Sequence, residues 1–337
     1  MRLIAMMMVG LLAAGCGAVD RAANTAAPGG TSPFAAAVAQ GSSGGAVRTL
    51  PDAQAGGAFL TGKGWLSGPR NDYNLGMDAG GRMLVFARSA ADFKDSHIWF
   101  ARREGKGWSA PAEVPFSDTR YKDSDPWLTP DGQALYFVSN RPVVGGAPNR
   151  SLDIWRVTVD AGGFGTPEHL AAVASEGEEL GPELHDGWLY FNSSRTGGPA
   201  KLSIYQARVN GNGFDAPLVL PAPFNDGDIQ GDLTLSPDGR VAVFWSRRED
   251  SDELDLFAAC RRPTAWSRAV RLPAPINGTG MDFTPAFSAD GSTLYFASLR
   301  AGDGVADAGD VLNGQSNLYT APATLVDAAL RAGECDV

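Results

Sequence analysis

A short motif recurs along this chain at nearly even intervals, and it constrains the fold more than any other feature. Its fullest copy begins at Asp123 and ends at Phe137, with a Thr-Pro-Asp-Gly turn followed by Leu-Tyr-Phe. Aligning the copies on the last aromatic residue gives intervals of 51, 54, 53 and 52 residues. Periods of this length are typical of β-propellers, in which each repeat builds one four-stranded blade. The aligned aromatics are Phe86, Phe137, Phe191, Phe244 and Phe296.

Each repeat carries the local signals of several strands. The segment before the Asp-Gly turn predicts an inner strand, and the apolar run after it, such as residues 134–139, predicts the second strand. Asp-Gly supplies the positive backbone dihedral angles that a tight hairpin requires. We expect a third strand around pairs such as Ile154-Trp155 and a fourth after a Gly-x-aromatic turn such as residues 163–164. The pattern therefore predicts an all-β propeller of four-stranded blades.

The two ends of the repeat region bear on the number of blades. The fifth repeat lacks a fourth strand, because residues 325–332 are typical of a short helix, whereas residues 46–51 resemble residues 269–273 of the fourth repeat. We therefore expect residues 46–51 to pair with the last blade and close a five-bladed ring, which would hide exposed strand edges. The alternative is six blades, the sixth built from residues 46–70 and the C-terminal tail.

The N-terminus has the features of an export signal. Met1-Arg2 and the apolar run that follows are too short for a membrane span. The run ends in Ala-Ala-Gly-Cys and resembles a bacterial lipoprotein signal. The resemblance implies a lipid anchor on Cys16 and an outer-membrane location. A plain cleaved signal is the alternative, because Ala13 stands where the lipoprotein pattern usually has leucine. The predicted organisation is a signal peptide (1–15), an Ala/Gly/Ser-rich flexible tether (16–45), the propeller (46–323) and a C-terminal tail (324–337).

Charge and cysteine content restrict the partners and the compartment. The net charge is −10 and the pI is about 4.8, which argues against nucleic acid or an anionic membrane surface as the main partner and leaves a cationic partner open. With Cys16 acylated, Cys260 and Cys335 remain. In an oxidising compartment they either form a disulfide or stay as two separate thiols.

The repeated pattern can be compared with a known family. An acidic residue, Ser/Thr-Pro-Asp-Gly, Leu-Tyr-Phe, Ser-x-Arg, Asp-Ile-Trp and Gly-Trp-x-x-Pro succeed one another within residues 70–323. This pattern resembles the TolB-type propeller repeat, which is similar in shape to the WD repeat. The resemblance implies a β-propeller. TolB-like modules occur in periplasmic docking proteins, in outer-membrane lipoproteins and beside peptidase domains, so the fold alone does not decide the activity.

Acidic residues gather around the predicted inner strands. Inner strands line the central channel of a propeller, so these carboxylates could form an acidic ring at one mouth that favours a cation or a basic peptide. Alternatively, each carboxylate caps a loop amide or pairs with one of the arginines that recur four residues after the aligned aromatic. The predicted ligand- or partner-binding residues are Asp123, Asp125, Glu178, Glu179, Asp228, Asp232 and Asp282.

The four recurring arginines are better suited to structure than to catalysis. A guanidinium fork can satisfy several carbonyls and one carboxylate at once, and a catalytic centre rarely needs fourfold repetition. The first repeat has Ala90 at the corresponding position. The arginines are Arg141, Arg195, Arg248 and Arg300.

Other motifs are weak. Asp303, Asp307 and Asp310 lie in a Gly-rich insertion and are weak calcium candidates, because their spacing does not follow an alternating calcium loop. The histidines fall in three different repeats, so no zinc site and no cofactor are expected.

We therefore predict a non-enzymatic cell-envelope propeller that binds a protein or an envelope ligand at its channel mouth. The alternative is a carbohydrate-active enzyme, which would need two carboxylates about 5 to 10 Å apart. The pairs to inspect are Asp125 with Asp282 and Glu178 with Asp232.

Overall fold

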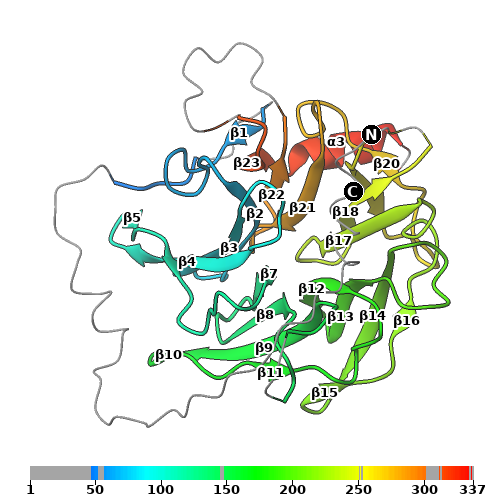
Figure 1. Ribbon diagram of the computed structural model, residues 1–337. Helices are drawn as coiled ribbons and strands as arrows, with labels where there is room; N and C mark the ends of the chain where they lie inside the picture. The colour runs from blue at the N-terminus through cyan, green and yellow to red at the C-terminus, as the bar shows by residue number, and fades with distance from the viewer. Residues whose placement is uncertain are drawn as a thin grey trace, which may run out of the picture. The chain divides into compact units, whose positions relative to one another are not determined.

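Five antiparallel sheets succeed one another along the chain, and their first strands surround a common centre (Figure 1). The computed structural model describes residues 47–51, 57–144, 148–249, 251, 253–300, 311, 313–333 and 335. The predictions made for Cys16, for the signal and tether, and for Asp303, Asp307 and Asp310 lie outside the described residues. The sheets confirm a five-bladed propeller of four-stranded blades and exclude the six-bladed alternative.

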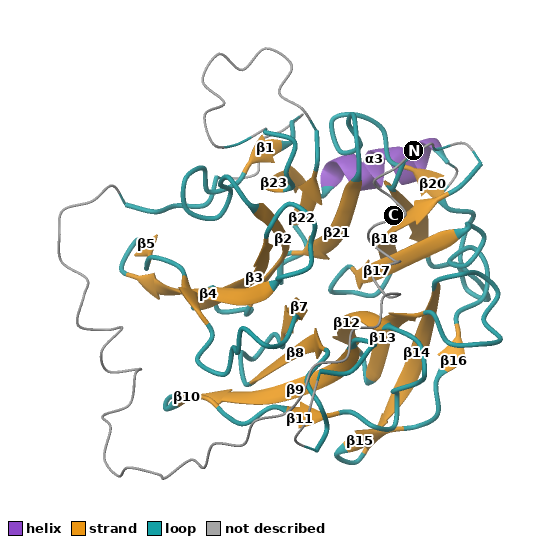
Figure 2. Ribbon diagram, in the orientation of Figure 1, coloured by secondary structure: helices purple, strands orange, loops and turns teal. Residues whose placement is uncertain are grey.

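In each blade the first three strands pair in the order in which they follow one another along the chain (Figure 2). The inner strands are β2 (Asn71–Met77), β7 (Asp123–Leu128), β12 (Glu179–His185), β17 (Ile229–Leu235) and β21 (Asp282–Phe287). The second strands are β3 (Met83–Ser89), β8 (Ala134–Ser139), β13 (Trp188–Ser193), β18 (Val241–Arg247) and β22 (Thr293–Ser298), and the third are β4 (His97–Glu104), β9 (Asp153–Asp160), β14 (Ser203–Asn210), β19 (Asp255–Cys260) and β23 (Asn317–Pro322).

The outer strands are short. In the first three blades the outer position is split into two pieces, and the fourth blade has one piece. The pieces are β5 (Gly107–Trp108) and β6 (Ala112–Glu113), β10 (Gly163–Phe164) and β11 (Glu168–His169), β15 (Gly213–Phe214) and β16 (Leu218–Val219), and β20 (Val270–Arg271).

An N-terminal strand closes the ring, but it is a different segment from the one predicted. β1 (Phe59–Leu60) pairs antiparallel with β23 and supplies the outer strand of the fifth blade. Residues 46–51 were the wrong choice, because Arg48 forms a bridge with Trp108 in the first blade, where the Trp108 amide donates to the Arg48 carbonyl at 3.0 Å. The likeness of residues 46–51 to another outer strand reflects local β propensity, which does not specify the partner.

The C-terminal segment confirms the predicted helix. α3 (Thr324–Ala332) follows β23 and buries Val326 and Leu330. After the helix, Cys335 forms a disulfide with Cys260 at the end of β19. The chain end is thereby tied to the fourth blade, one of the two alternatives that the sequence left open for these cysteines. Among the described residues, no helix is long and apolar enough to cross a membrane.

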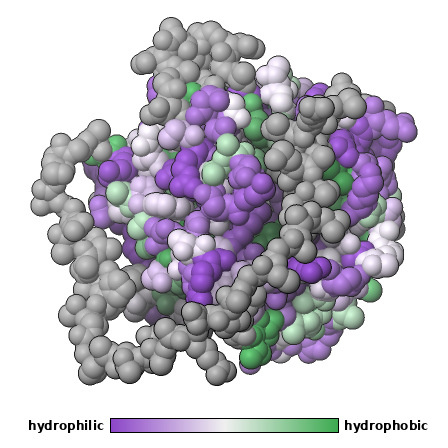
Figure 3. Space-filling model, viewed as in Figure 1, coloured by the Kyte–Doolittle hydropathy of each residue, from purple (hydrophilic) through white to green (hydrophobic). Residues whose placement is uncertain are grey.

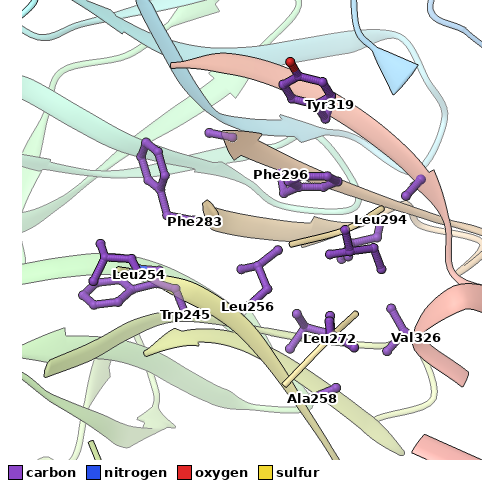
Figure 4. Packing of buried hydrophobic residues seen from close by; sticks show 14 of the residues in the cluster. Trp245, Leu254, Leu256, Ala258, Leu272, Phe283, Leu294, Phe296, Tyr319 and Val326 are labelled. Atoms are coloured by element: carbon purple, nitrogen blue, oxygen red, sulfur yellow. The ribbon is translucent and has the colours of Figure 1, made fainter. Parts of the chain in front are cut away.

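The hydrophobic core lies in the seams between neighbouring blades. The second and third strands contribute apolar side chains to five clusters. Figure 4 shows one seam, in which Trp245 and Leu256 of the fourth blade lie across from Phe283 and Phe296 of the fifth, with Val326 of α3 at one side. Burial of apolar surface between blades is therefore what holds adjacent sheets together.

The face of the propeller seen in Figure 3 is mainly hydrophilic. Purple side chains prevail among the described atoms on the face seen in Figure 3, with scattered green patches. The large apolar side chains that are exposed among the described residues are few and include Val144, Leu218 and Val219. Scattered exposure of this kind is normal for a soluble protein surface.

Candidate functional site in the central channel

Every inner strand has a β-bulge at the same place. The pairing with the second strand shifts register there, as between Ser124 and Trp127 in β7. The residue in the bulge has a left-handed backbone with φ between +47° and +56°. Such values are uncommon outside glycine, although Asn and Asp adopt them more readily than other residues. The five bulge residues are Asn74, Asp125, Gly181, Asp232 and Thr284.

The bulge residues line a cavity on the axis of the ring, together with the two positions after each of them in four blades and the one position after Asp232 in the fourth blade. The cavity volume is about 30 Å³, which is room for one or two water molecules. Of the seven acidic residues predicted as binding candidates, two line this cavity, Asp125 and Asp232. No lysine or arginine stands among the described residues that line it.

Asp125 and Asp232 converge on Gly181. The Gly181 amide donates to Asp125 Oδ2 at 3.0 Å. A Cβ atom at position 181 would lie 2.0 Å from Asp232 Oδ1, so the absent side chain makes the space that the Asp232 carboxyl occupies. The left-handed backbone of Gly181, with φ +56°, favours glycine at this position as well.

The remaining hydrogen bonds of the two carboxylates come from neutral donors. The Ser124 hydroxyl donates to Asp125 at 2.8 Å. Asn192 Nδ2 donates to one oxygen of Asp232 at 2.9 Å, and Trp245 Nε1 donates to the other at 2.8 Å. These donors orient the two carboxylates without neutralising their charge.

A third carboxylate in the cavity, Glu183, was not predicted from the sequence. It stands two residues after the bulge of β12, the position that Trp127 and Thr234 occupy in the neighbouring blades. Its Oε1 accepts hydrogen bonds from the Leu235 amide at 3.0 Å and the Thr234 hydroxyl at 3.2 Å. Alignment of the repeats on the bulge, rather than on the Asp-Gly turn, would have drawn attention to it.

The surroundings favour the protonated form of these groups. Desolvation by burial, followed by the charge of Asp125, raises the pKa of Asp232 from 3.8 to about 7. Desolvation likewise raises the pKa of Glu183 from 4.5 to about 8 and raises the pKa of Asp125. Groups of this kind cluster at functional sites, which makes the channel the leading candidate.

Three other predicted residues lie in buried ion pairs two positions before the bulge. Arg141 donates to both oxygens of Asp123 at 2.8 Å, and Asp123 is fully buried. Arg195 pairs in the same way with one oxygen of Glu179 at 3.2 Å, and Arg300 with one oxygen of Asp282 at 2.7 Å. These carboxylates hold the inner strand of a blade to the arginine that follows its second strand, so their geometry is that of a structural clamp.

The arginines also bind the linker that leads into their own blade. Arg195 donates to the Val173 carbonyl at 2.7 Å, and Arg300 donates to the Pro275 carbonyl at 2.8 Å. In the first blade Arg88 replaces the arginine missing at Ala90 and pairs with Asp72 at 2.6 Å. Each clamp therefore joins the inner strand to the arginine of the same blade, and in the third and fifth blades the arginine also holds the connection from the blade before.

The last two predicted residues lie outside the cavity. Glu178 is half-buried and accepts a hydrogen bond from the Leu152 amide at 2.9 Å, and burial raises its pKa. Asp228 is partly exposed and pairs with Lys201 and Arg247, whose hydrogen bonds lower its pKa. The structure thus does not bring all seven carboxylates into one ring. No group of three or more His, Cys, Asp or Glu side chains in the described part of the chain could hold a metal ion.

Comparison with known proteins finds solved structures of similar fold. No family model and no curated protein matches this chain. An α-L-arabinofuranosidase from Lactobacillus brevis is similar in structure, with a TM-score of 0.51 and 14% identity over 76% of this chain and 91% of that one.

TolB from Acinetobacter baumannii is also among the similar solved structures, with a TM-score of 0.45 and 14% identity over 75% of this chain and 54% of that one. An oligogalacturonate lyase has a TM-score of 0.40 and 15% identity over 74% of this chain and 64% of that one. At such identities the likeness to the arabinofuranosidase shows the fold alone: this chain is a five-bladed β-propeller whose structural neighbours include TolB proteins.

Proposed function

We propose that this chain is a non-enzymatic propeller of the bacterial cell envelope that binds a cationic protein segment or envelope ligand at the mouth of its channel. The observation that carries the proposal is the convergence of Asp125, Glu183 and Asp232 in a cavity whose lining has no lysine or arginine among the described residues. A cation brought close to these groups favours their ionised form, and carboxylates in a narrow, partly desolvated channel attract positive charge strongly, because the surrounding protein screens their field less than water does.

The size of the cavity also favours a slender charged group. A volume of about 30 Å³ admits a water molecule or the ammonium group of a lysine side chain. Pockets that hold whole small molecules usually measure about 300 to 1,000 Å³. A lysine or an amino terminus of a partner could reach the carboxylates from the mouth while the rest of the partner contacted the surrounding loops.

The envelope location rests on two features of the sequence and one of the structure. The predicted signal and Cys16 imply export and a lipid anchor. The buried disulfide between Cys260 and Cys335 supports an oxidising compartment, since such bonds are rare in the cytosol. The tether at 16–45 would hold the propeller away from the membrane.

The proposal is tested with a fluorescein-labelled peptide of lysines. We expect the Asp125→Asn/Asp232→Asn protein to bind it at least about tenfold more weakly than the wild type, which is about 1.4 kcal/mol. The matched control is Asp131→Asn/Asp238→Asn, which removes the same charge from two hairpin turns. There the hydrogen bonds from the Thr129 and Ser236 hydroxyls and from the Gln133 and Arg240 amides use Oδ1, which asparagine retains.

Two outcomes of the peptide experiment would contradict the proposal. One is an equal loss of affinity in both double variants, which would mean that only net charge matters. The other is an unchanged affinity in the channel variant. Thermal melting of each variant establishes that the channel variant is folded.

One observation favours a second function, a carbohydrate-active enzyme. Asp232, whose pKa burial raises to about 7, lies beside a second carboxyl, Asp125, and a carboxylic acid with a raised pKa beside another carboxyl group is what glycoside hydrolysis requires. The two pairs named from the sequence are less suited to this chemistry, because Asp282 is bound by Arg300 and Glu178 by the Leu152 amide. The small cavity favours binding over turnover. Turnover of any glycan in a panel, abolished by Asp232→Asn, would establish the enzyme instead.

A further inference from the structure

We infer that Asp125, Glu183 and Asp232 form a pH-sensitive element at the centre of the ring, which holds the inner strands together while protonated and loosens them when it ionises. The three carboxyl groups come from three consecutive blades, on β7, β12 and β17. They line one cavity of about 30 Å³. Any change in their charge therefore acts on three blades at once.

The hydrogen bonds of these partly exposed groups differ from those of the fully buried carboxylates on the same strands. Asp123, Glu179 and Asp282, two residues before each bulge, all accept from an arginine. The channel carboxyls accept from hydroxyl, amide and indole groups, as the contacts of Asp232 with Asn192 and Trp245 show. The inner strands thus carry carboxylates paired with arginine two residues before the bulge. At the bulge or two residues after it, they carry carboxyl groups bonded to neutral donors.

The crowding around Gly181 makes the element sensitive to charge. Asp125 Oδ2 is 3.0 Å from the Gly181 nitrogen, and Asp232 Oδ1 occupies the space of the missing Cβ. The Asp232 amide and side chain are both held by Asn192, so this carboxyl cannot move away without breaking those bonds. Two negative charges held against one backbone segment repel each other in a poorly screened site.

The groups that face the element from the packed strands are mostly neutral. Asn74 of β2 and Thr284 of β21, which carry no charge, also line the cavity. The Tyr73 hydroxyl lies 3.1 Å from Ser124 Oγ, and its pKa is raised to about 12, so it stays neutral.

Two charged residues next to inner strands also act on the element. Burial raises the pKa of Asp125 and of Glu178, and the positive charge of Lys122, which does not line the cavity, offsets part of that rise. Glu178 adds negative charge, and Asp125 raises its pKa.

The direction of the pH dependence follows from the raised pKa values. Asp232 has a pKa of about 7 in the folded protein against 3.8 ordinarily, and Glu183 has a pKa of about 8 against 4.5. Below about pH 4 the two groups are protonated in the folded and in the unfolded protein, and their contribution to folding stability is complete. That contribution is lost progressively as the pH rises to about 8. Above that range the folded protein has also released these protons, and the loss is complete.

Thermal melting of the full chain between pH 4 and pH 9 tests the inference. Variants Glu183→Gln and Asp232→Asn mimic the neutral groups, so we expect their Tm to fall less than that of the wild type. The difference between variant and wild type should widen by about 4 °C or more from the acid to the alkaline end. Because other buried carboxylates also titrate, the difference between the proteins is the informative quantity rather than the wild-type curve alone.

The matched control is Asp186→Asn, which removes one charge from an exposed hairpin position with φ +47° that asparagine tolerates. Its Tm difference from the wild type should stay constant with pH. Infrared spectra of the wild type supply a second readout: a protonated carboxyl band at pH 6 that Glu183→Gln weakens. Parallel pH profiles for wild type and both channel variants, or the absence of that band, would overturn the inference, and neither result bears on peptide binding.

Discussion

Breaking the disulfide between Cys260 and Cys335 should lower the free energy of unfolding by about 4.5 kcal/mol. The two cysteines are 75 residues apart, and the closed loop contains α3 and the strands of the fifth blade other than β1. In the chain-entropy model the bond changes the conformational entropy of the unfolded chain by −2.1 − 1.5R ln n cal/mol/K. For a loop of this length, that entropy loss raises the free energy of the unfolded chain by about 4.5 kcal/mol at 25 °C. For a domain of this size that corresponds to a fall in Tm of about 10 °C or more.

The measurement compares the wild type with Cys260→Ala/Cys335→Ala in urea, followed by tryptophan fluorescence. Both cysteines are only 3% exposed, so a reducing agent alone would reach the bond slowly, whereas the double variant removes it completely. The alanines delete one buried sulfur each and add about 1 kcal/mol apiece to the loss. The control is the double variant with and without reducing agent, which should unfold at the same urea concentration.

The reasoning behind this prediction would be refuted by a loss below about 1 kcal/mol. That result would mean that the unfolded chain gains little freedom when the bond is absent, so that the fifth blade and α3 stay associated with the fourth blade without it. A loss near the predicted value, with hydrogen exchange accelerated in α3, would establish the disulfide as a second closure of the ring beside the pairing of β1 with β23.

Two further predictions concern the inner strands. Gly181→Ala should destabilise the protein by at least about 2 kcal/mol, because it adds left-handed strain to a Cβ placed 2.0 Å from Asp232 Oδ1. Gly187→Ala, with φ +76° and open space around the added atom, should cost only the strain of about 1 kcal/mol, and equal Tm losses in the two variants would contradict the crowding. Arg141→Ala should cost about 3 to 5 kcal/mol in urea unfolding by leaving Asp123 buried and uncompensated. Adding Asp123→Asn to it should restore part of that loss, and a double variant no more stable than Arg141→Ala would refute the clamp.

Much of the fold could be predicted because it depends on contacts close in sequence. The second strand predicted at residues 134–139 is β8, Ala134–Ser139, and the helix expected at 325–332 is α3. Asp-Gly turns and alternating apolar residues act over a few positions, so each blade reveals its own hairpin. The closing strand was placed wrongly, because residues 46–51 and β1 have similar local propensities and only the route of the whole chain selects between them.

The candidate site was predicted in part. Asp125 and Asp232 were among the seven carboxylates singled out, but Asp123 and Asp282 lie in the same strands as channel-lining residues and face arginines instead. The position of the bulge decides whether a side chain of an inner strand faces the channel or an arginine. A bulge is defined by the pairing of two strands, so a single strand's sequence does not locate it. Glu183 was not predicted to line the cavity, because its position relative to the bulge of β12 depends on the same strand pairing.

The sequence by itself determined the repeat, and with it a ring of four-stranded blades and a surplus of negative charge, because these depend on local patterns and on composition. Tertiary structure decided which carboxylates meet an arginine and which meet one another. That distinction depends on distances between residues of different blades, such as Asp232 and Gly181, which are 51 positions apart in the chain and in contact at the axis. A charge is stabilised or penalised by what lies within a few ångströms of it, and for these groups the neighbours come from the closure of the ring.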